Sequence, residues 1–201
     1  MSDTNNQTIQ AYETHVQEYI DGSPHELTGV VKEWFDTIIA QLPKDARILE
    51  LGSGFGRDAA YLAAHGFPVL CSDATQAFVD FLQQKGLAAR KLNAITDPID
   101  GGPYDMILAY AVLLHFTRDE ARQVAQKVRA ALKPGGMFAL TVKQGEGERW
   151  LDDKLGVPRY FCFWQPEPLR QMLYAAGFRD ITIASDKATR HATWVQVVAR
   201  P

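Results

Sequence analysis

Three glycines and two acids in this sequence have the types and spacing of a nucleotide site. The segment 50–57 reads Glu-Leu-Gly-Ser-Gly-Phe-Gly-Arg, and it follows a short apolar run, 47–51. A strand that ends in glycines at the start of a helix brings bare backbone N–H groups close to a ligand. Asp73 ends a second apolar run, 68–72. A carboxylate there is placed to accept hydrogen bonds from both hydroxyls of a ribose.

The spacing of the glycines separates two classes of nucleotide loop. A dinucleotide fingerprint, G-x-G-x-x-G, needs its last glycine at position 57, where this chain has Arg57. The pattern is therefore G-x-G-x-G. It argues against a nicotinamide-dependent dehydrogenase, the rival that the fold alone would allow.

These motifs resemble those of the class I S-adenosylmethionine-dependent methyltransferases. Their loop reads acid-x-G-x-G-x-G with a second acid ending the next strand, as 50–56 and Asp73 do here. The pairs and tracts at 104–105 and 133–136 follow in the family's order and spacing, and the resemblance runs from about Ile9 to the C-terminus. Two further tracts, 113–115 and 142–148, are similar to a bacterial subgroup thought to act on small molecules.

The resemblance implies S-adenosylmethionine as the cofactor and S-adenosylhomocysteine as the product. It implies that Glu50 orients the loop and the methionine end of the cofactor, unless it is only a buried acid tied to backbone amides. The expected cofactor-binding residues are Tyr19, Glu50, Gly52, Ser53, Gly54, Arg57, Asp73, Ala74, Asn93, Ala94, Ala109 and Tyr110.

Several of these positions have a plainer structural alternative. Ser53 and Gly54 are expected to present backbone N–H groups to the cofactor. Arg57 either pairs with the methionine carboxylate or is a solvated residue in the first turn of a helix. Asn93 either faces the adenine amino group through its carbonyl oxygen or caps the following turn. Asp73 either binds ribose or serves as a helix N-cap.

Methyl transfer from a sulfonium is an in-line displacement on an electrophile that is already activated. The protein mainly has to hold nucleophile, methyl carbon and sulfur in line and exclude water. A base is needed only when the acceptor must lose a proton. His115, after the fourth strand, is the candidate catalytic base; the alternative is a packed loop histidine in the apolar run 112–116.

The segment 144–165 reads as a long irregular stretch rich in aromatic residues, and such a connection is usually functional. With the N-terminal helix it is expected to line the acceptor pocket. Lys143, Arg159 and Tyr160 are the candidate substrate-binding residues for a polar or anionic acceptor. The alternative is that the aromatics are core and the charges are solvated.

Strand-like and helix-like runs alternate through the chain and end in two strands, 178–185 and 193–199, joined by a polar turn. The pattern predicts an α/β fold: a doubly wound, mostly parallel seven-stranded sheet with helices on both faces, a C-terminal antiparallel hairpin and an N-terminal helical lid. Ligands bind such sheets at the carboxyl ends of the strands, where strand order reverses. Residues 117–120 form a capping box for one of the helices.

The chain is expected to be one domain, with a frayed tail at 1–8, N-terminal helices over 9–42 and the sheet core over 43–201. Ile9, Tyr12, Val16 and Tyr19 recur at helical spacing. That helix either packs on the domain or closes over the cofactor as a lid. Residues 23–26 read as a capping box that starts a second helix, which ends at Pro43.

Composition fits a cytoplasmic, non-membrane protein, and the small-molecule partner is what the resemblance implies. The chain has 201 residues and a net charge of −3, with no long basic run, so no nucleic-acid partner is expected. No apolar run reaches ~18 residues, and the N-terminus lacks a signal peptide's apolar core. The two cysteines make no disulfide framework, and the histidines have no metal-ligand spacing. The oligomeric state cannot be read from the sequence.

Two other functions remain open at this stage. One is a methyltransferase that acts on a macromolecule, although amino-methylating DNA enzymes carry a [DN]-P-P-[YF] tract where this chain reads Ala-Tyr-Ala-Val at 109–112. The other is a cofactor-binding module without catalysis, because an intact loop predicts binding and cannot prove turnover.

Overall fold

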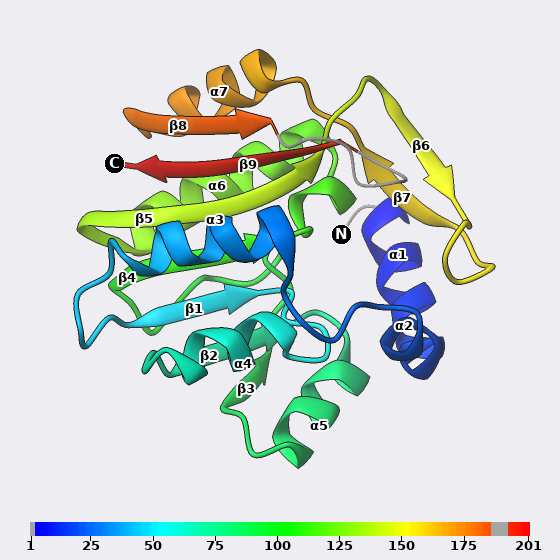
Figure 1. Cartoon of the computed structure of the whole chain (residues 1–201). Coiled ribbons are helices and arrows are strands. Elements are labelled where there is room, and N and C mark those ends of the chain that lie inside the picture. Colours follow the sequence, from blue (N-terminus) through cyan, green and yellow to red (C-terminus); the bar gives the residue numbers. More distant parts are fainter. Residues whose placement is uncertain (1–2, 186–192) are drawn as a thin grey trace.

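A seven-stranded sheet forms the centre of the computed structural model, which describes residues 3–185 and 193–201. The strand order is β3-β2-β1-β4-β5-β9-β8 (Figure 1). β1 pairs in parallel with β2 and β4, whereas β9 runs antiparallel to β5 and β8. The strands are β1 Ile48–Leu51, β2 Val69–Asp73, β3 Ala89–Lys91, β4 Tyr104–Tyr110, β5 Leu132–Lys143, β8 Asp180–Ser185 and β9 Trp194–Arg200. The predicted fold class is confirmed; the polar turn expected between the last two strands lies outside the described residues.

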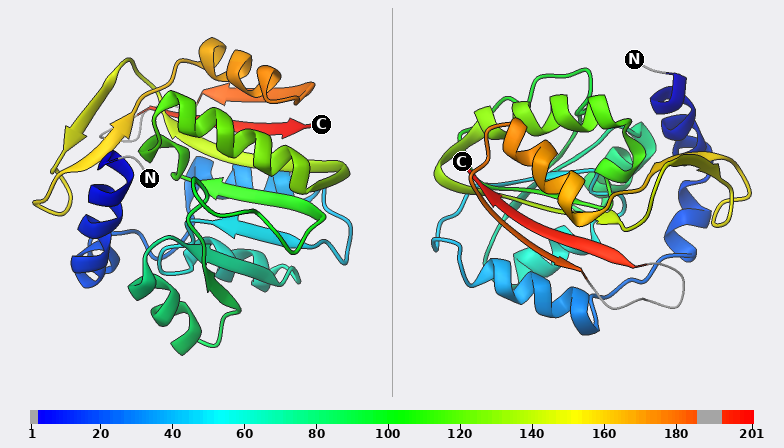
Figure 2. Two further views of the ribbon diagram at one scale, coloured as in Figure 1. Left: turned by 180° about the vertical axis from the view of Figure 1, so that it is seen from behind. Right: turned by 90° about the horizontal axis from the view of Figure 1, so that it is seen from above.

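Helices cover both faces of the sheet. Figure 2 shows α6 and α7 on one face and α3 on the other. The helices are α1 Asp3–Thr14, α2 Val16–Asp21, α3 Gly29–Ile39, α4 Arg57–Ala64, α5 Gln76–Gln84, α6 Arg118–Ala131, α7 Pro166–Ala175 and the short 3₁₀ helix η1 Leu113–His115. No helix in the described part of the chain is long and apolar enough to cross a membrane.

The alternation of side chains along β4 builds two hydrophobic cores. Ile107 and Ala109 belong to the core under α6 and α7, whereas Met106 and Leu108 belong to the core under α3 and α4. All four side chains are fully buried. A strand covered on both faces reads as a continuous apolar run, as this one does in the sequence.

The N-terminal tail is not frayed as the sequence predicted. Helix α1 already begins at Asp3, and the side chains of Asn5 and Thr8 are buried. The hydroxyl oxygen of Thr8 accepts a hydrogen bond from the backbone N–H of Tyr160, 3.1 Å away. Long-range contacts of this kind stabilise a polar helix whose own sequence has little tendency to order.

The two predicted capping boxes have different outcomes. At 117–120 the box forms: the N–H of Glu120 donates to the Thr117 hydroxyl, and the Glu120 carboxylate accepts from the N–H of Thr117. The box at 23–26 does not form, because the Ser23 hydroxyl donates back to the carbonyl of Tyr19. Helix α3 instead begins after Thr28, so residues 22–28 cross the molecule as an irregular segment.

The segment 144–165 is not irregular throughout. It contains two short strands, β6 Glu148–Leu151 and β7 Arg159–Cys162, which pair antiparallel in a sheet of their own. This hairpin projects beyond the main sheet and lies beside α1 (Figure 1). Strands of four residues carry too little periodicity to be recognised in a sequence.

Candidate cofactor and acceptor site

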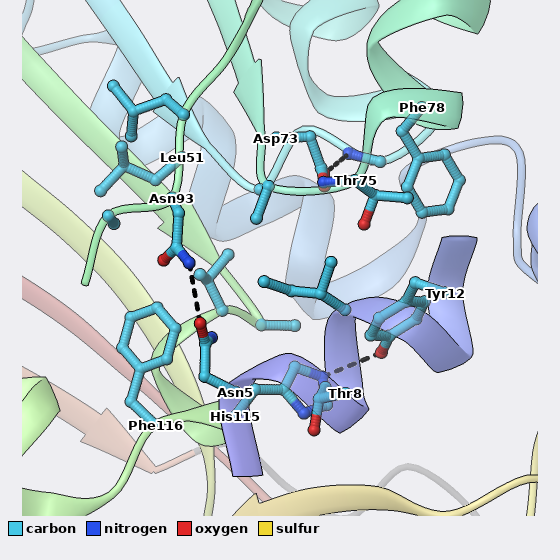
Figure 3. A pocket seen from close by; sticks show the side chains of 18 of the residues that line it. Asn5, Thr8, Tyr12, Leu51, Asp73, Thr75, Phe78, Asn93, His115 and Phe116 are labelled. Atoms are coloured by element: carbon cyan, nitrogen blue, oxygen red, sulfur yellow. Dashed lines mark hydrogen bonds between the residues drawn. The ribbon is translucent and has the colours of Figure 1, made fainter. Parts of the chain in front are cut away.

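The carboxyl ends of β1, β2 and β4 meet at a cavity of about 110 Å³. Gly52, Asp73, Asn93 and Tyr110 all line it, as predicted from their positions at strand ends. Figure 3 shows Asn5, Thr8 and Tyr12 of α1 opposite Asp73, Thr75 and Phe78 across this space. We call it the inner cavity. Its wall thus combines residues far apart in the sequence.

The first glycine of the loop is required by the backbone and by its neighbour. Gly52 has φ of +65°, a conformation that side chains other than glycine rarely adopt. A Cβ atom at this position would lie 2.5 Å from Cγ2 of Val112. Glycine therefore keeps the end of β1 open at the point where the inner cavity reaches the backbone.

Asp73 organises the loop from the neighbouring strand. Its Oδ2 accepts the N–H of Gly54 and its Oδ1 accepts the N–H of Thr75, both at 2.9 Å. Burial raises the pKa of this carboxyl, and the two amides oppose the shift. Each oxygen keeps a further lone pair, so ribose hydroxyls can still be accepted.

The loop amides are not bare, contrary to the sequence prediction. The N–H of Ser53 donates to the carbonyl oxygen of Ser72, and the N–H of Gly54 donates to Asp73. Buried backbone donors are rarely left without partners, and the neighbouring strand β2 satisfies these two. Ser53 lines only the larger of two cavities described below.

Glu50 is a buried acid that lacks a full set of partners. Its side chain lies within β1, and its Oε2 has no hydrogen-bond partner among the described residues. Burial, and then the nearby carboxylate of Asp58, raise the pKa of Glu50 to about 8. An uncompensated carboxyl beneath the loop fits a ligand that carries positive charge at that end.

Arg57 is not a solvated residue. Its Nε–H donates to Oδ1 of Asp58 at 2.7 Å, and its guanidinium lies 5.0 Å from the centroid of the Tyr110 ring. The alternative in which it projects into solvent is wrong, because the ring and the carboxylate hold it along the wall of the larger cavity.

At the adenine side, the two interpretations of Asn93 are compatible. Its Oδ1 accepts the N–H of Ile95 at 3.1 Å and so caps the following turn, and its side chain also lines the inner cavity. The Nδ2 donates to Oδ1 of Asn5 at 2.8 Å, a contact that the sequence prediction missed. Ala74 and Ala94 line the inner cavity as predicted.

Ala109 does not take the position predicted for it. It is fully buried within β4 and lines neither cavity, because its side chain points into the core under α6 and α7. Ala111 lines both cavities instead. Its φ of +58° is unusual for a residue with a Cβ, and such backbone strain clusters at functional sites.

The N-terminal helices lie where the lid alternative expects them. Tyr12 of α1 and Tyr19 of α2 line both cavities, and their rings meet edge to face with centroids 5.3 Å apart. The carboxylate of Glu13 accepts the backbone N–H groups of Gln76 and Ala77, at 2.8 and 3.0 Å. Glu13 therefore fastens α1 to the first turn of α5.

We expect Glu13→Ala to loosen this attachment. Loss of a carboxylate that satisfies two N–H groups of a helix start lowers the free energy of unfolding by about 1 kcal/mol. The cofactor should then bind roughly 5-fold more weakly, mainly through faster dissociation, because α1 forms one wall of its cavity. Stopped-flow release and calorimetry measure both effects. Glu18→Ala, on the exposed side of α2, is the control; equal rates in the two variants would contradict a role for Glu13.

His115 stands in a chain of hydrogen bonds. Its Nδ1 lies 2.7 Å from the carbonyl oxygen of Tyr160, which can only accept, so Nδ1 carries the proton. Its Nε2 therefore accepts from the hydroxyl of Tyr12 at 2.9 Å, and that hydroxyl accepts from Arg159 at 3.1 Å. Burial lowers the pKa of His115 to about 3, so the imidazole is neutral at physiological pH.

A second cavity of about 530 Å³, the outer cavity, adjoins the first. The two share Tyr12, Tyr19, Gly52, Gly54, Tyr110, Ala111 and His115. Lys143 and Arg159 line the outer cavity as predicted, and Arg159 is buried, which contradicts the alternative of solvated charge. Lys154, between β6 and β7, lines it too and was missed because a lysine in a predicted loop carries no signal of burial.

Tyr160 does not line either cavity with its side chain. The ring packs against Trp150 with centroids 5.7 Å apart, and the residue is 5% exposed. The backbone of Tyr160 makes the contacts instead: its N–H donates to the Thr8 hydroxyl, and its carbonyl oxygen accepts from Nδ1 of His115.

In the described part of the chain, no three His, Cys, Asp or Glu side chains lie close enough together to bind a metal ion.

Comparison with known proteins agrees with this geometry. A family described as a methyltransferase domain matches residues 49–138, the segment from β1 into β5. A putative methyltransferase, YqeM from Bacillus subtilis, is 26% identical over 140 residues, covering 66% of this chain and 54% of that protein. A tRNA 5-carboxymethoxyuridine methyltransferase from Escherichia coli is 26% identical over 126 residues, covering 56% and 46%. The chain spans about half the length of these curated relatives.

A solved structure extends the similarity to nearly the whole fold. Magnesium protoporphyrin IX methyltransferase from Synechocystis, with S-adenosylhomocysteine bound, superposes with a TM-score of 0.70 at 17% identity. The match covers 96% of this chain and 97% of that one. Together with the loop at Gly52, the buried Asp73 and the unpartnered Glu50, it fits S-adenosylmethionine as the cofactor. Residues 49–138 therefore match a methyltransferase domain, and nearly the whole chain has the fold of a solved methyltransferase.

Proposed function

We propose that this protein transfers the methyl group of S-adenosylmethionine to a small-molecule acceptor by in-line displacement. The observation that carries the proposal is the pair of adjoining cavities: the inner one lies beside Asp73 and Asn93, and the outer one, about 530 Å³, lies beyond the shared residues. A volume of that size accommodates a small metabolite or xenobiotic.

Each residue of the site has a part in this scheme. Bound cofactor supplies a methyl group on a sulfonium, which needs no further activation. Asp73 binds the ribose hydroxyls, and Glu50 complements positive charge at the methionine end. Tyr12 and Tyr19 cover the two cavities and exclude water, which is the positioning that this chemistry requires.

His115 contributes through Tyr12 in this proposal. Its Nε2 is already occupied by the Tyr12 hydroxyl, so a direct role as the base requires that this bond open first. With the bond in place, His115 positions the phenol between the two cavities. A proton leaving the acceptor can reach Nε2 only through the Tyr12 hydroxyl.

Action on a macromolecule is the second candidate, and three relatives favour it, since their names assign them tRNA nucleosides. The net charge of −3 and the position of Lys143, Lys154 and Arg159 inside a cavity support a small acceptor instead. Nucleic-acid binding needs cations along an exposed surface. Cys71 and Cys162 are both free thiols, which supports the cytoplasmic location that we propose.

Cofactor binding is tested by thermal or chemical unfolding. S-adenosylmethionine at 100 times its dissociation constant should raise the free energy of unfolding by ~2.7 kcal/mol, because it binds only the folded chain. NADH at the same concentration is the control and should have no effect. Stabilisation by NADH alone would overturn the assignment.

Turnover separates an enzyme from a binding module. Incubation of the protein and methyl-labelled cofactor with extracts of small metabolites should release S-adenosylhomocysteine and label a small product. Labelling of tRNA instead of the small-molecule fraction would favour the second candidate. If the protein binds S-adenosylmethionine but releases no S-adenosylhomocysteine with any metabolite or tRNA fraction, a non-catalytic module is the better description.

A further inference from the structure

The outer cavity has an excess of positive charge that the protein itself does not balance. Lys143, Lys154 and Arg159 line it together. The ion pair that the structure gives to these three joins Arg159 to Asp153 at 3.3 Å, and the Asp153 side chain is 62% exposed. Arg159 is buried, Lys143 is half-buried and Lys154 is exposed. A charge withdrawn from water normally has a partner, so a buried arginine beside two lysines calls for a ligand of opposite charge.

Arg159 is the clearest sign of an absent partner. Its side chain is 4% exposed, and its Nε–H has no hydrogen-bond partner in the described part of the chain. One guanidinium nitrogen donates to the Tyr12 hydroxyl, between the two cavities. A buried guanidinium donor without an acceptor is costly, and anionic oxygens are the groups it binds best.

Neither lysine has a carboxylate partner in the described part of the chain, and an aromatic ring covers part of each side chain; Lys143 is half-buried and Lys154 is more exposed. The ammonium of Lys143 lies 4.4 Å from the centroid of the Phe161 ring, and that of Lys154 lies 4.0 Å from the Tyr19 ring centroid. Lys154 also donates to the Ser23 hydroxyl at 2.5 Å. Burial, followed by the charges of Arg159, Arg57 and Lys143, lowers the pKa of Lys154 to about 8.

Acidic groups on the same wall do not cancel this charge. Asp58 is engaged by Arg57 at 2.7 Å, and Glu26 and Asp153 are exposed. The remaining wall includes aliphatic residues and the aromatic rings of Phe55, Tyr110, Phe161 and Trp194. The cavity thus offers cations at one place and apolar rings around them, which is the pattern of a site for an organic anion.

We propose that the methyl acceptor is a small organic anion, an aromatic or apolar body carrying a carboxylate or similar oxygen group, which Arg159, Lys143 and Lys154 bind in the outer cavity. The inference that the bound anion is the methyl acceptor rests on the proposed function. The anion-binding site does not, because residues of this chain form it. Bound negative charge also raises the pKa of Lys154, so binding near pH 8 takes up a proton.

The test uses matched probes: benzoate against benzamide, phenylacetate against phenylacetamide, and phenylphosphonate. Each is titrated calorimetrically into the protein with S-adenosylhomocysteine, at pH 8, in two non-anionic buffers of different ionisation enthalpy. We expect at least one carboxylate or phosphonate to bind at least 10-fold more tightly than its neutral counterpart, with net proton uptake. The phosphonate arm separates a preference for a dianion from one for a carboxylate.

Variants assign the effect to the cavity. Lys143→Gln should lower anion affinity at least 10-fold and leave amide binding unchanged, whereas Lys44→Gln, an exposed lysine in the turn before β1, should bind like the parent. Lys154→Gln should abolish the proton uptake. Arg159→Gln should give the largest loss, and Lys143→Gln keeps the test valid if that variant does not fold.

Three results would overturn the anionic acceptor: equal affinity for an anion and its amide, no binding of either, or an anion affinity in Lys143→Gln that equals the parent's. Binding of S-adenosylhomocysteine is measured first on the same samples. Its failure would overturn the proposed function separately, and the anion titrations would then be run without it, because the cations do not depend on the cofactor.

Discussion

Asp73→Ala is expected to weaken S-adenosylmethionine binding by about 3 kcal/mol, roughly 100-fold, and to leave the protein folded. Charge-assisted hydrogen bonds are worth about 1.5–3 kcal/mol each, and the carboxylate is placed to accept two from a ribose. The substitution also removes the acceptor of the Gly54 and Thr75 amides, so the loop that lines the inner cavity loses its anchor on β2.

Calorimetry on the cofactor and its demethylated product measures this change, with circular dichroism as the check on folding. Asp73→Asn should lie between parent and alanine variant, because one amide oxygen remains to accept. Asp80→Ala removes an exposed carboxylate from the neighbouring helix α5 and is the matched control. An affinity equal to the parent's in Asp73→Ala would show that the ribose role is wrong.

The second large effect is a stability that falls in acid because of His115. Its pKa is about 3 in the folded protein against an ordinary 6.5, the shift being caused by burial. Between these values the unfolded chain binds a proton that the folded chain does not, so a fall in pH favours unfolding. The contribution is fully present above pH 6.5 and is lost progressively toward pH 3.

Each pH unit in this window is worth at most about 1.4 kcal/mol, so the loss between pH 6.5 and 4 is as much as about 3 kcal/mol. His115→Asn removes the titrating group while keeping a donor for the Tyr160 carbonyl. Its free energy of unfolding in urea should be lower than the parent's at neutral pH and flatter below pH 6.5.

Comparing the two profiles cancels the titration of the carboxyl groups they share. His65→Asn is the control for loss of an imidazole, since His65 is exposed at the end of α4. Parallel profiles for parent and His115→Asn would mean that the histidine is not held neutral by its surroundings.

Local patterns were enough to predict the sheet and the cofactor side of the site. The glycine spacing at 52–56, the acid at position 73 and the continuous apolar run of β4 each act through neighbours in sequence or within one strand. The carboxyl ends of parallel strands must meet at one edge, so residues at those ends were predicted to converge, and Gly52, Asp73, Asn93 and Tyr110 do.

The errors have a common physical cause. Asn5 and Thr8 were assigned to a frayed tail because nothing in 1–8 favours a helix, yet contacts of α1 with β7 and α5 order this segment from Asp3 onward. Ala109 was placed on the correct strand, whereas Tyr160 was placed in a segment expected to be irregular and lies on β7. In both strands the side chain of the residue points away from the cavities. The amides of Ser53 and Gly54 were expected to lack partners, because their acceptors lie on β2, which the loop sequence does not reveal.

The sequence by itself determined the class of fold and the nucleotide loop, since these follow from short-range spacing, and the resemblance carried by the same motifs implied the cofactor. Only the tertiary structure decided that Lys154 joins Lys143 and Arg159, that Tyr12 occupies Nε2 of His115, and that Glu13 fastens α1 to α5. The contact between Glu13 and Gln76 joins residues 63 positions apart, and the contact between Tyr12 and His115 joins residues 103 positions apart. The partner of a charged or hydroxyl side chain cannot be predicted from its residue type, because packing of the folded chain determines it.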